Sequence, residues 1–126
     1  MIGYVTLGTN DLEKSAAFYD ALLAELGAKR FMEMENFIAW TSGPSGCGLG
    51  ITRPHDGDAA CVGNGVMVAL AADSPEKVDA VYAKAIELGA QDEGPAGPRG
   101  DTFYAGYFRD PDGNKLNVFC MTQAEE

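Results

Sequence analysis

The side chains that most often carry chemistry are few in this sequence and are widely spaced. His55 is the only histidine, and the three cysteines, Cys47, Cys61 and Cys120, form no Cys-X-X-Cys pair. No histidine lies near Cys47 to generate a thiolate, which disfavours a cysteine nucleophile. The run from Gly46 to Gly50 lacks the third glycine of a dinucleotide loop and opens no helix. The sequence therefore predicts no metal site, no cofactor and no nucleotide loop built from these residues.

Charge and length narrow the classes of partner. The chain has 126 residues and a net charge of −10, which suits one domain and repels nucleic-acid phosphates. The acidity favours a cationic ligand, or it serves solubility alone. No apolar run approaches the roughly 20 residues of a membrane span, and no signal peptide is visible at the N-terminus. We expect a cytoplasmic protein that contacts neither nucleic acid nor membrane.

Two segments repeat apolar residues at three- and four-residue steps, the spacing of one helix face. The first stripe consists of Leu12, Ala16, Tyr19, Leu23 and Leu26. The second consists of Val78, Val81, Tyr82, Ala85 and Leu88. Asn10 or Asp11 can cap the first helix and Ser74 the second. Gly27 and Gly89 follow the stripes, as glycine often follows a helix.

Short β-prone runs surround both helices. They span 2–7, 29–34, 37–41, 49–52, 66–71, a stretch around 91, 103–108 and 115–119. The sequence from Asp110 to Asn114 is a strong turn signal before the last strand. The run 94–100, rich in glycine and proline, is predicted to be a loop. The run 54–65 reads as a linker between module one, 1–53, and module two, 66–122.

The two halves of the chain resemble each other. Tyr4–Leu7 can be aligned with Met67–Leu70, and Leu49-Gly50-Ile51 with Leu116-Asn117-Val118. Similarity at about half the chain length indicates two stacked copies of one β-α-β-β-β unit. A chance match of helix-ending Leu-Gly pairs explains less, because strand, cap, helix and stop all correspond.

Two motifs resemble those of the vicinal oxygen chelate superfamily, which includes glyoxalases, bleomycin-resistance proteins and dioxygenases. The segment from Tyr4 to Tyr19, YVTLGTNDLEKSAAFY, is similar to the family's opening strand and helix. The segment from Phe108 to Leu116, FRDPDGNKL, is similar to the turn before its last strand. The resemblance covers essentially the whole chain. It implies one α+β domain, 1–126, in which two tandem β-α-β-β-β modules form a cupped eight-stranded mixed sheet with helices outside.

The resemblance also implies where the family's usual four metal ligands would fall. These positions are Tyr4, Gly50, Met67 and Asn117, with Gly50 placed only by the internal repeat. None is a histidine or a carboxylate, the usual ligands of hard or borderline divalent ions. The expected metal site is therefore degenerate.

Strand alternation then predicts which side chains face the cup. Taking Tyr4 as inward-facing, alternation gives as candidate ligand-binding residues Tyr4, Thr6, Met67, Asn117 and Phe119. Two more candidates are Tyr107, on a strand whose register the sequence leaves open, and Trp40, the sole tryptophan, as a wall of the cup. Each also has an alternative, purely structural explanation. Met67 and Phe119 can be plain packing, the tyrosines can be structural, and Trp40 can lie at a subunit interface. Arg109 is expected to pair with Asp110 or Asp112 rather than to bind an anion.

Two functions remain open from the sequence. The first is a small-molecule-binding protein with an aromatic, metal-free cup. The alternative is a glyoxalase-like lyase, or a metal-independent isomerase that uses Tyr4, Tyr107 or Asn117 as polar groups. A homodimer is implied by the resemblance alone, and the modules of related folds pair either within or between chains.

Overall fold

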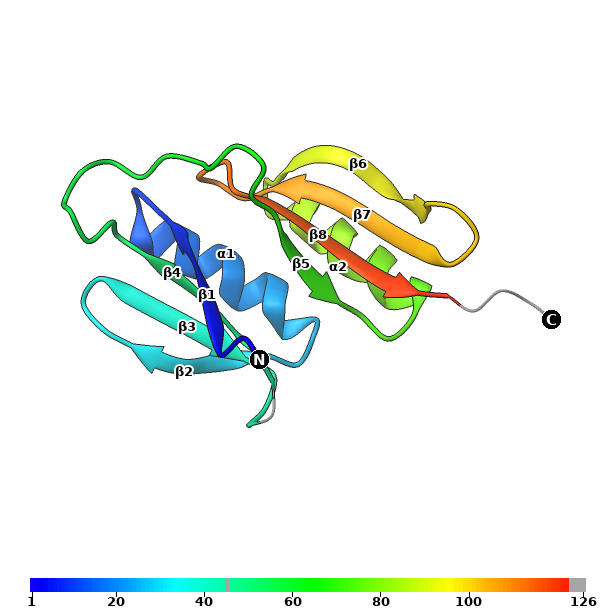
Figure 1. Ribbon diagram of the computed structural model, residues 1–126, viewed down its shortest axis with the longest axis horizontal. Coiled ribbons are helices and arrows are strands. Elements are labelled where there is room, and N and C mark those ends of the chain that lie inside the picture. Colours follow the sequence, from blue (N-terminus) through cyan, green and yellow to red (C-terminus); the bar gives the residue numbers. More distant parts are fainter. Residues whose placement is uncertain (45, 123–126) are drawn as a thin grey trace.

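A computed structural model describes residues 1–44 and 46–122 of the chain (Figure 1). The first half contains β1 (Tyr4–Gly8), α1 (Leu12–Ala24), β2 (Lys29–Glu33), β3 (Phe37–Thr41) and β4 (Gly48–Thr52). The second contains β5 (Val68–Ala71), α2 (Pro75–Glu87), β6 (Gln91–Pro98), β7 (Phe103–Arg109) and β8 (Lys115–Met121). The predicted tandem β-α-β-β-β modules are confirmed.

The strands form two four-stranded mixed sheets rather than one continuous hydrogen-bonded sheet. Sheet A has the order β1-β4-β3-β2, and sheet B has the equivalent order β5-β8-β7-β6. Thr6 lies opposite Gly50 in sheet A, and Ala69 lies opposite Asn117 in sheet B. These are the pairings that the internal sequence alignment implies, so the repeat extends to strand register.

Each helix begins at a side-chain cap and covers one face of its own sheet. Asp11 accepts a hydrogen bond from the Lys14 N–H, and Ser74 accepts one from the Lys77 N–H, which satisfies amides that the helix leaves unpaired. Gly27 follows α1 with φ of 74°, a conformation that favours glycine. Figure 1 shows α1 behind sheet A and α2 behind sheet B, with the opposite face of each sheet uncovered.

Alternation along the strands fills the space beneath the helices with apolar side chains. The largest fully buried side chains include Trp40, Tyr19, Phe108, Leu22, Ile51, Leu116 and Val118. They come from both modules and belong to one continuous core. Leu7 is buried whereas Tyr4 and Thr6 are exposed, as strand alternation predicted.

A buried carboxylate joins the two modules. The Tyr19 hydroxyl on α1 donates to Oδ2 of Asp110 at 2.6 Å, and Asn114 donates from its side chain to the same oxygen. The backbone amides of Asp112 and Asn114 donate to the other oxygen, Oδ1. Burial raises the pKa of Asp110 from its ordinary value, and these hydrogen bonds oppose the rise. The predicted turn thus also anchors α1 to the second module.

One local prediction was wrong. Residues 94–100 were expected to form a loop, but β6 continues to Pro98. Its pairing with β7 shifts register between Asp92 and Gly94 and again between Gly94 and Gly97. An irregular edge strand tolerates proline because only one side of it must pair. Among the described residues, no helix is long and apolar enough to cross a membrane.

Candidate functional site

The uncovered face of sheet A carries two of the predicted site residues. Tyr4 is 55% exposed, and Thr6 follows it on the same face of β1. The Tyr4 ring packs edge-on against Phe37, with ring centroids 6.0 Å apart. Phe37 in turn covers Gly50, since a Cβ built on that glycine would lie 2.6 Å from the Phe37 ring. In this half of the site, the rings of Tyr4 and Phe37 form an aromatic surface, and the Phe37 ring lies directly over Gly50.

The uncovered face of sheet B carries four more predicted site residues. Tyr107 on β7 lies opposite Asn117 on β8, and Phe119 follows Asn117 on the same face. Phe119 stacks on Phe103 with ring centroids 5.5 Å apart. Met67 lies just before β5 and is 41% exposed. The result is a second aromatic surface with one amide at its centre.

The Asn117 amide is unusual because its oxygen lacks a donor. The residue is 2% exposed, and Oδ1 has no hydrogen-bond partner among the described residues. A buried acceptor left unpaired costs about 1–3 kcal/mol. Such groups are rare in folded proteins and need an explanation. A ligand that supplies an N–H or O–H would relieve this cost.

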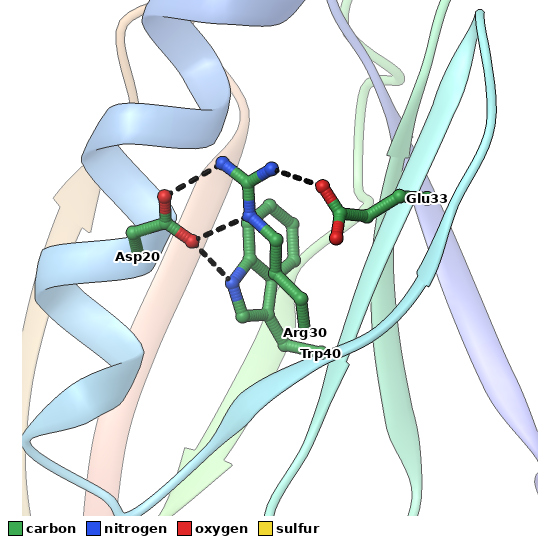
Figure 2. A network of polar contacts seen from close by, with 4 residues as sticks. All are labelled: Asp20, Arg30, Glu33 and Trp40. Atoms are coloured by element: carbon green, nitrogen blue, oxygen red, sulfur yellow. Dashed lines mark hydrogen bonds and ion pairs between the residues drawn. The ribbon is translucent and has the colours of Figure 1, made fainter.

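Trp40 does not join these residues. Its side chain is buried on the helix-covered face of sheet A, where its Nε1 donates to Oδ1 of Asp20 at 2.9 Å (Figure 2). The Arg30 guanidinium lies over the indole, 5.8 Å from the ring centroid, and pairs with both Asp20 and Glu33. The hydrogen bond from Arg30 lowers the pKa of Asp20. The prediction that Trp40 lines the cup was wrong. Its position along β3 places the side chain on the face that α1 covers.

A separate apolar cavity lies on the helix side of sheet A. It has a volume of about 290 Å³ and is bordered by Trp40, the C-terminal part of α1, Cys47 and strand β5. None of the other predicted site residues lines it. Trp40 therefore marks a different space from the one that Tyr107 and Asn117 face.

Cations gather on the uncovered face of sheet B. Arg109 pairs with Glu93, with Nε 2.9 Å from Oε1, and not with Asp110 or Asp112 as expected. The strand pairing of β6 with β7 brings Glu93 close, whereas Asp110 is turned toward Tyr19. Lys115 Nζ and the Arg99 guanidinium lie 5.7 and 5.5 Å from the centre of the Tyr107 ring. A cation that lies over the face of an aromatic ring is attracted by the ring's negative face.

No strand of sheet A comes within 8 Å, Cα to Cα, of a strand of sheet B in the described parts of the chain. The two aromatic faces are therefore separate surfaces within one chain. Tyr4 and Thr6 lie on one, while Met67, Tyr107, Asn117 and Phe119 lie on the other.

Comparison with known proteins agrees with this architecture. The family model of the glyoxalase/bleomycin resistance protein/dioxygenase superfamily matches residues 1–118. The chain belongs to this superfamily. A solved glyoxalase/bleomycin resistance protein from Albidiferax ferrireducens T118 is 40% identical, with a TM-score of 0.87 over 95% of this chain and 98% of that one. No curated protein matches the sequence.

More distant members share the superfamily fold. A putative glyoxalase from Bacillus halodurans is 25% identical, with a TM-score of 0.75 over 95% of each chain. A lactoylglutathione lyase from Agrobacterium tumefaciens is 22% identical, with a TM-score of 0.71 over 95% of this chain and 92% of that one. At that identity the similarity establishes the fold and not the reaction.

The side chains at the superfamily's ligand positions do not fit a divalent ion. Tyr4, Met67 and Asn117 offer a phenol, a thioether and an amide, which are poor ligands for such an ion. The fourth position, Gly50, offers no side chain, and the Phe37 ring fills the space above it. Within residues 1–44 and 46–122, no group of three or more His, Cys, Asp or Glu residues could hold a metal ion. The packing of Tyr4 and Phe37 over Gly50 occupies the positions where metal-coordinating groups would be needed.

Proposed function

We propose that this protein binds a small aromatic molecule on the uncovered face of sheet B without using a metal. The observation that carries the proposal is the Asn117 oxygen, which is buried in the middle of an aromatic surface with no donor from residues 1–44 or 46–122. Small-molecule sites commonly combine apolar walls with a few placed polar groups. Here Tyr107, Phe103 and Phe119 supply the rings, and Asn117 supplies the acceptor.

The chemistry of this face favours a flat ligand with a hydrogen-bond donor. Stacked and edge-on ring contacts add about 0.5–1.5 kcal/mol each beyond the burial of apolar area. The donor would reach Asn117 after a covering side chain moves aside. Lys115 is suited to this movement because it is long and lies two residues away on the same face of β8. The ligand would then gain both stacking and a hydrogen bond.

A matched pair of fluorescent probes tests this proposal. After treatment with a chelator, the protein is titrated with 2-naphthol, which carries a hydroxyl donor, and with 2-methoxynaphthalene, which lacks it. We expect one 2-naphthol per chain and roughly fivefold to tenfold weaker binding of the methoxy compound. Equal affinity for both probes, or no saturable binding of either, would contradict the proposal. Metal-dependent turnover of a hemithioacetal would instead favour the lyase.

We further propose that a second copy of the chain packs against the uncovered aromatic face of sheet A. Tyr4 and Phe31 lie together over Gly48 on the open face of sheet A and are 55% and 48% exposed. Large apolar side chains grouped on an open sheet face are typical of an interaction surface. Light scattering after size exclusion is expected to give twice the chain mass of 13.3 kDa. Phe31→Glu should shift the protein to the monomer. A wild-type monomer at micromolar concentration would contradict the dimer.

A further inference from the structure

A pocket of about 380 Å³ opens between the linker and the uncovered face of sheet B. It is bordered by the segment 62–67, by Arg109 and by Lys115. The lining contains two cations and no carboxylate. The whole chain has 19 acidic and 9 basic residues, so a pocket whose charged lining residues are all basic differs from the rest of the protein.

The charges at this pocket do not cancel. Arg109 is held by Glu93 and also donates from Nη1 to the Gly113 carbonyl at 2.8 Å. Lys115 makes no ion pair with any described residue, although it is only partly exposed. Its ammonium lies 5.7 Å from the centre of the Tyr107 ring. The pocket therefore retains one uncompensated positive charge, on Lys115.

The charged residues that line the pocket are cations, although the chain as a whole is acidic. At physiological ionic strength, charges are screened over about 8 Å, so distant surface carboxylates contribute little to the potential at Lys115. A ligand anion within hydrogen-bond reach of the ammonium would form a charge-assisted contact, which is the stronger class of hydrogen bond. The local environment thus favours a negative group.

The pocket adjoins the face that carries the proposed ligand site. Lys115 and Asn117 lie two residues apart on the same face of β8, which places their Cα atoms about 7 Å apart. The Tyr107 ring lies beside both, opposite Asn117 and beneath the Lys115 ammonium. A rigid ligand of one or two fused rings could therefore present a donor to Asn117 and an anion to Lys115.

We propose that the pocket is the subsite for the acid group of an aromatic carboxylate. A carboxylate fits better than a doubly charged phosphate because Lys115 carries the one uncompensated positive charge of the pocket lining. The Arg99 guanidinium lies outside that lining and donates to backbone carbonyls. This inference rests on the proposed aromatic site and specifies its ligand class. It replaces the cationic ligand that net charge suggested with an anionic one.

The test compares 6-hydroxy-2-naphthoate with 2-naphthol, which has the same ring system and donor but no acid group. Chelator-treated protein is titrated with each probe by calorimetry at low and at high salt. We expect the acid to bind about tenfold more tightly than 2-naphthol. Added salt should reduce that difference while leaving the affinity for 2-naphthol unchanged.

Variants at Lys115 distinguish an effect of its positive charge on acid binding from an effect of its side chain on the local structure. Lys115→Gln should remove the tenfold preference for the acid, and Lys115→Arg should retain most of it. Lys14→Gln makes the same charge change on the exposed side of α1 and should have no effect. Thermal melts of all variants check that each is folded.

The outcomes distinguish the subsite from the site. If 2-naphthol binds and the acid binds no better, the carboxylate subsite is refuted while the aromatic site stands. If neither probe binds, the proposed function itself fails. If Lys115→Gln keeps the full preference, another cation holds the acid and the assignment to Lys115 is wrong.

Discussion

Replacing Asp110 with alanine is expected to lower the free energy of unfolding by about 3 kcal/mol. The Asp110 carboxylate accepts four hydrogen bonds, from the Tyr19 hydroxyl, the Asn114 side chain and the amides of Asp112 and Asn114. The alanine variant leaves these donors without their acceptor and releases α1 from the second module. Urea unfolding followed by circular dichroism measures the change.

A neighbouring aspartate provides the control. Asp112→Ala removes one hydrogen bond, from the exposed Asn10 amide, and should cost less than about 1 kcal/mol. A loss at Asp110 no larger than that at Asp112 would contradict the anchoring role of the turn.

The pH dependence of the same variant gives an independent check. Burial raises the pKa of Asp110 in the folded protein above its ordinary 3.8. The folded state therefore binds a proton more readily than the unfolded state does. This contribution to stability is fully present below pH 3.8 and is lost as pH rises through the folded pKa. Asp110→Ala should lack this component, so its difference from wild type should shrink as pH rises through that window.

Asn117→Leu is expected to weaken 2-naphthol binding about tenfold while raising the free energy of unfolding by about 1 kcal/mol. Leucine has a similar shape and removes the unpaired buried oxygen. The folded state therefore gains stability, whereas the ligand loses its hydrogen-bond acceptor. Probe titration and urea unfolding of the same preparation measure the two effects. A polar group retained only for structure would not produce these opposite changes.

The same replacement at Asn36 is the matched control. Asn36 is exposed, and its backbone carbonyl accepts hydrogen bonds from the Arg53 N–H and the Thr52 hydroxyl. Asn36→Leu should leave probe affinity unchanged. If Asn117→Leu destabilises the protein by 1 kcal/mol or more, its amide is structural and the account of the site fails.

Much of the fold was predictable because its signals are local. Apolar stripes and caps determine α1 and α2, and the turn from Asp110 to Asn114 has a conformation that its residue types favour. The repeat predicted equivalent strand registers because both modules must bury the same alternate positions. Strand alternation placed Tyr4, Thr6, Asn117 and Phe119 on the faces turned away from the helices, where the structure has them, whereas the sequence left the register of β7, which carries Tyr107, open.

The features that the sequence did not predict depend on contacts between distant segments. Trp40 was expected in the cup, but its place on β3 turns it toward α1, where Asp20 accepts its N–H. Arg109 was expected to pair along the chain, but strand pairing brings it to Glu93. The pocket beside Lys115 forms only when the linker passes over the ends of β7 and β8. None of these contacts follows from spacing in the sequence.

The central claim is an aromatic ligand site that works without a metal, and one titration tests it most directly. Chelator-treated protein and protein dialysed against zinc, nickel, manganese and iron(II) are each titrated with 2-naphthol, with elemental analysis of both samples. The account predicts saturable binding with the same affinity in both. Binding that appears only in the metal-treated sample, together with a stoichiometric metal, would contradict it.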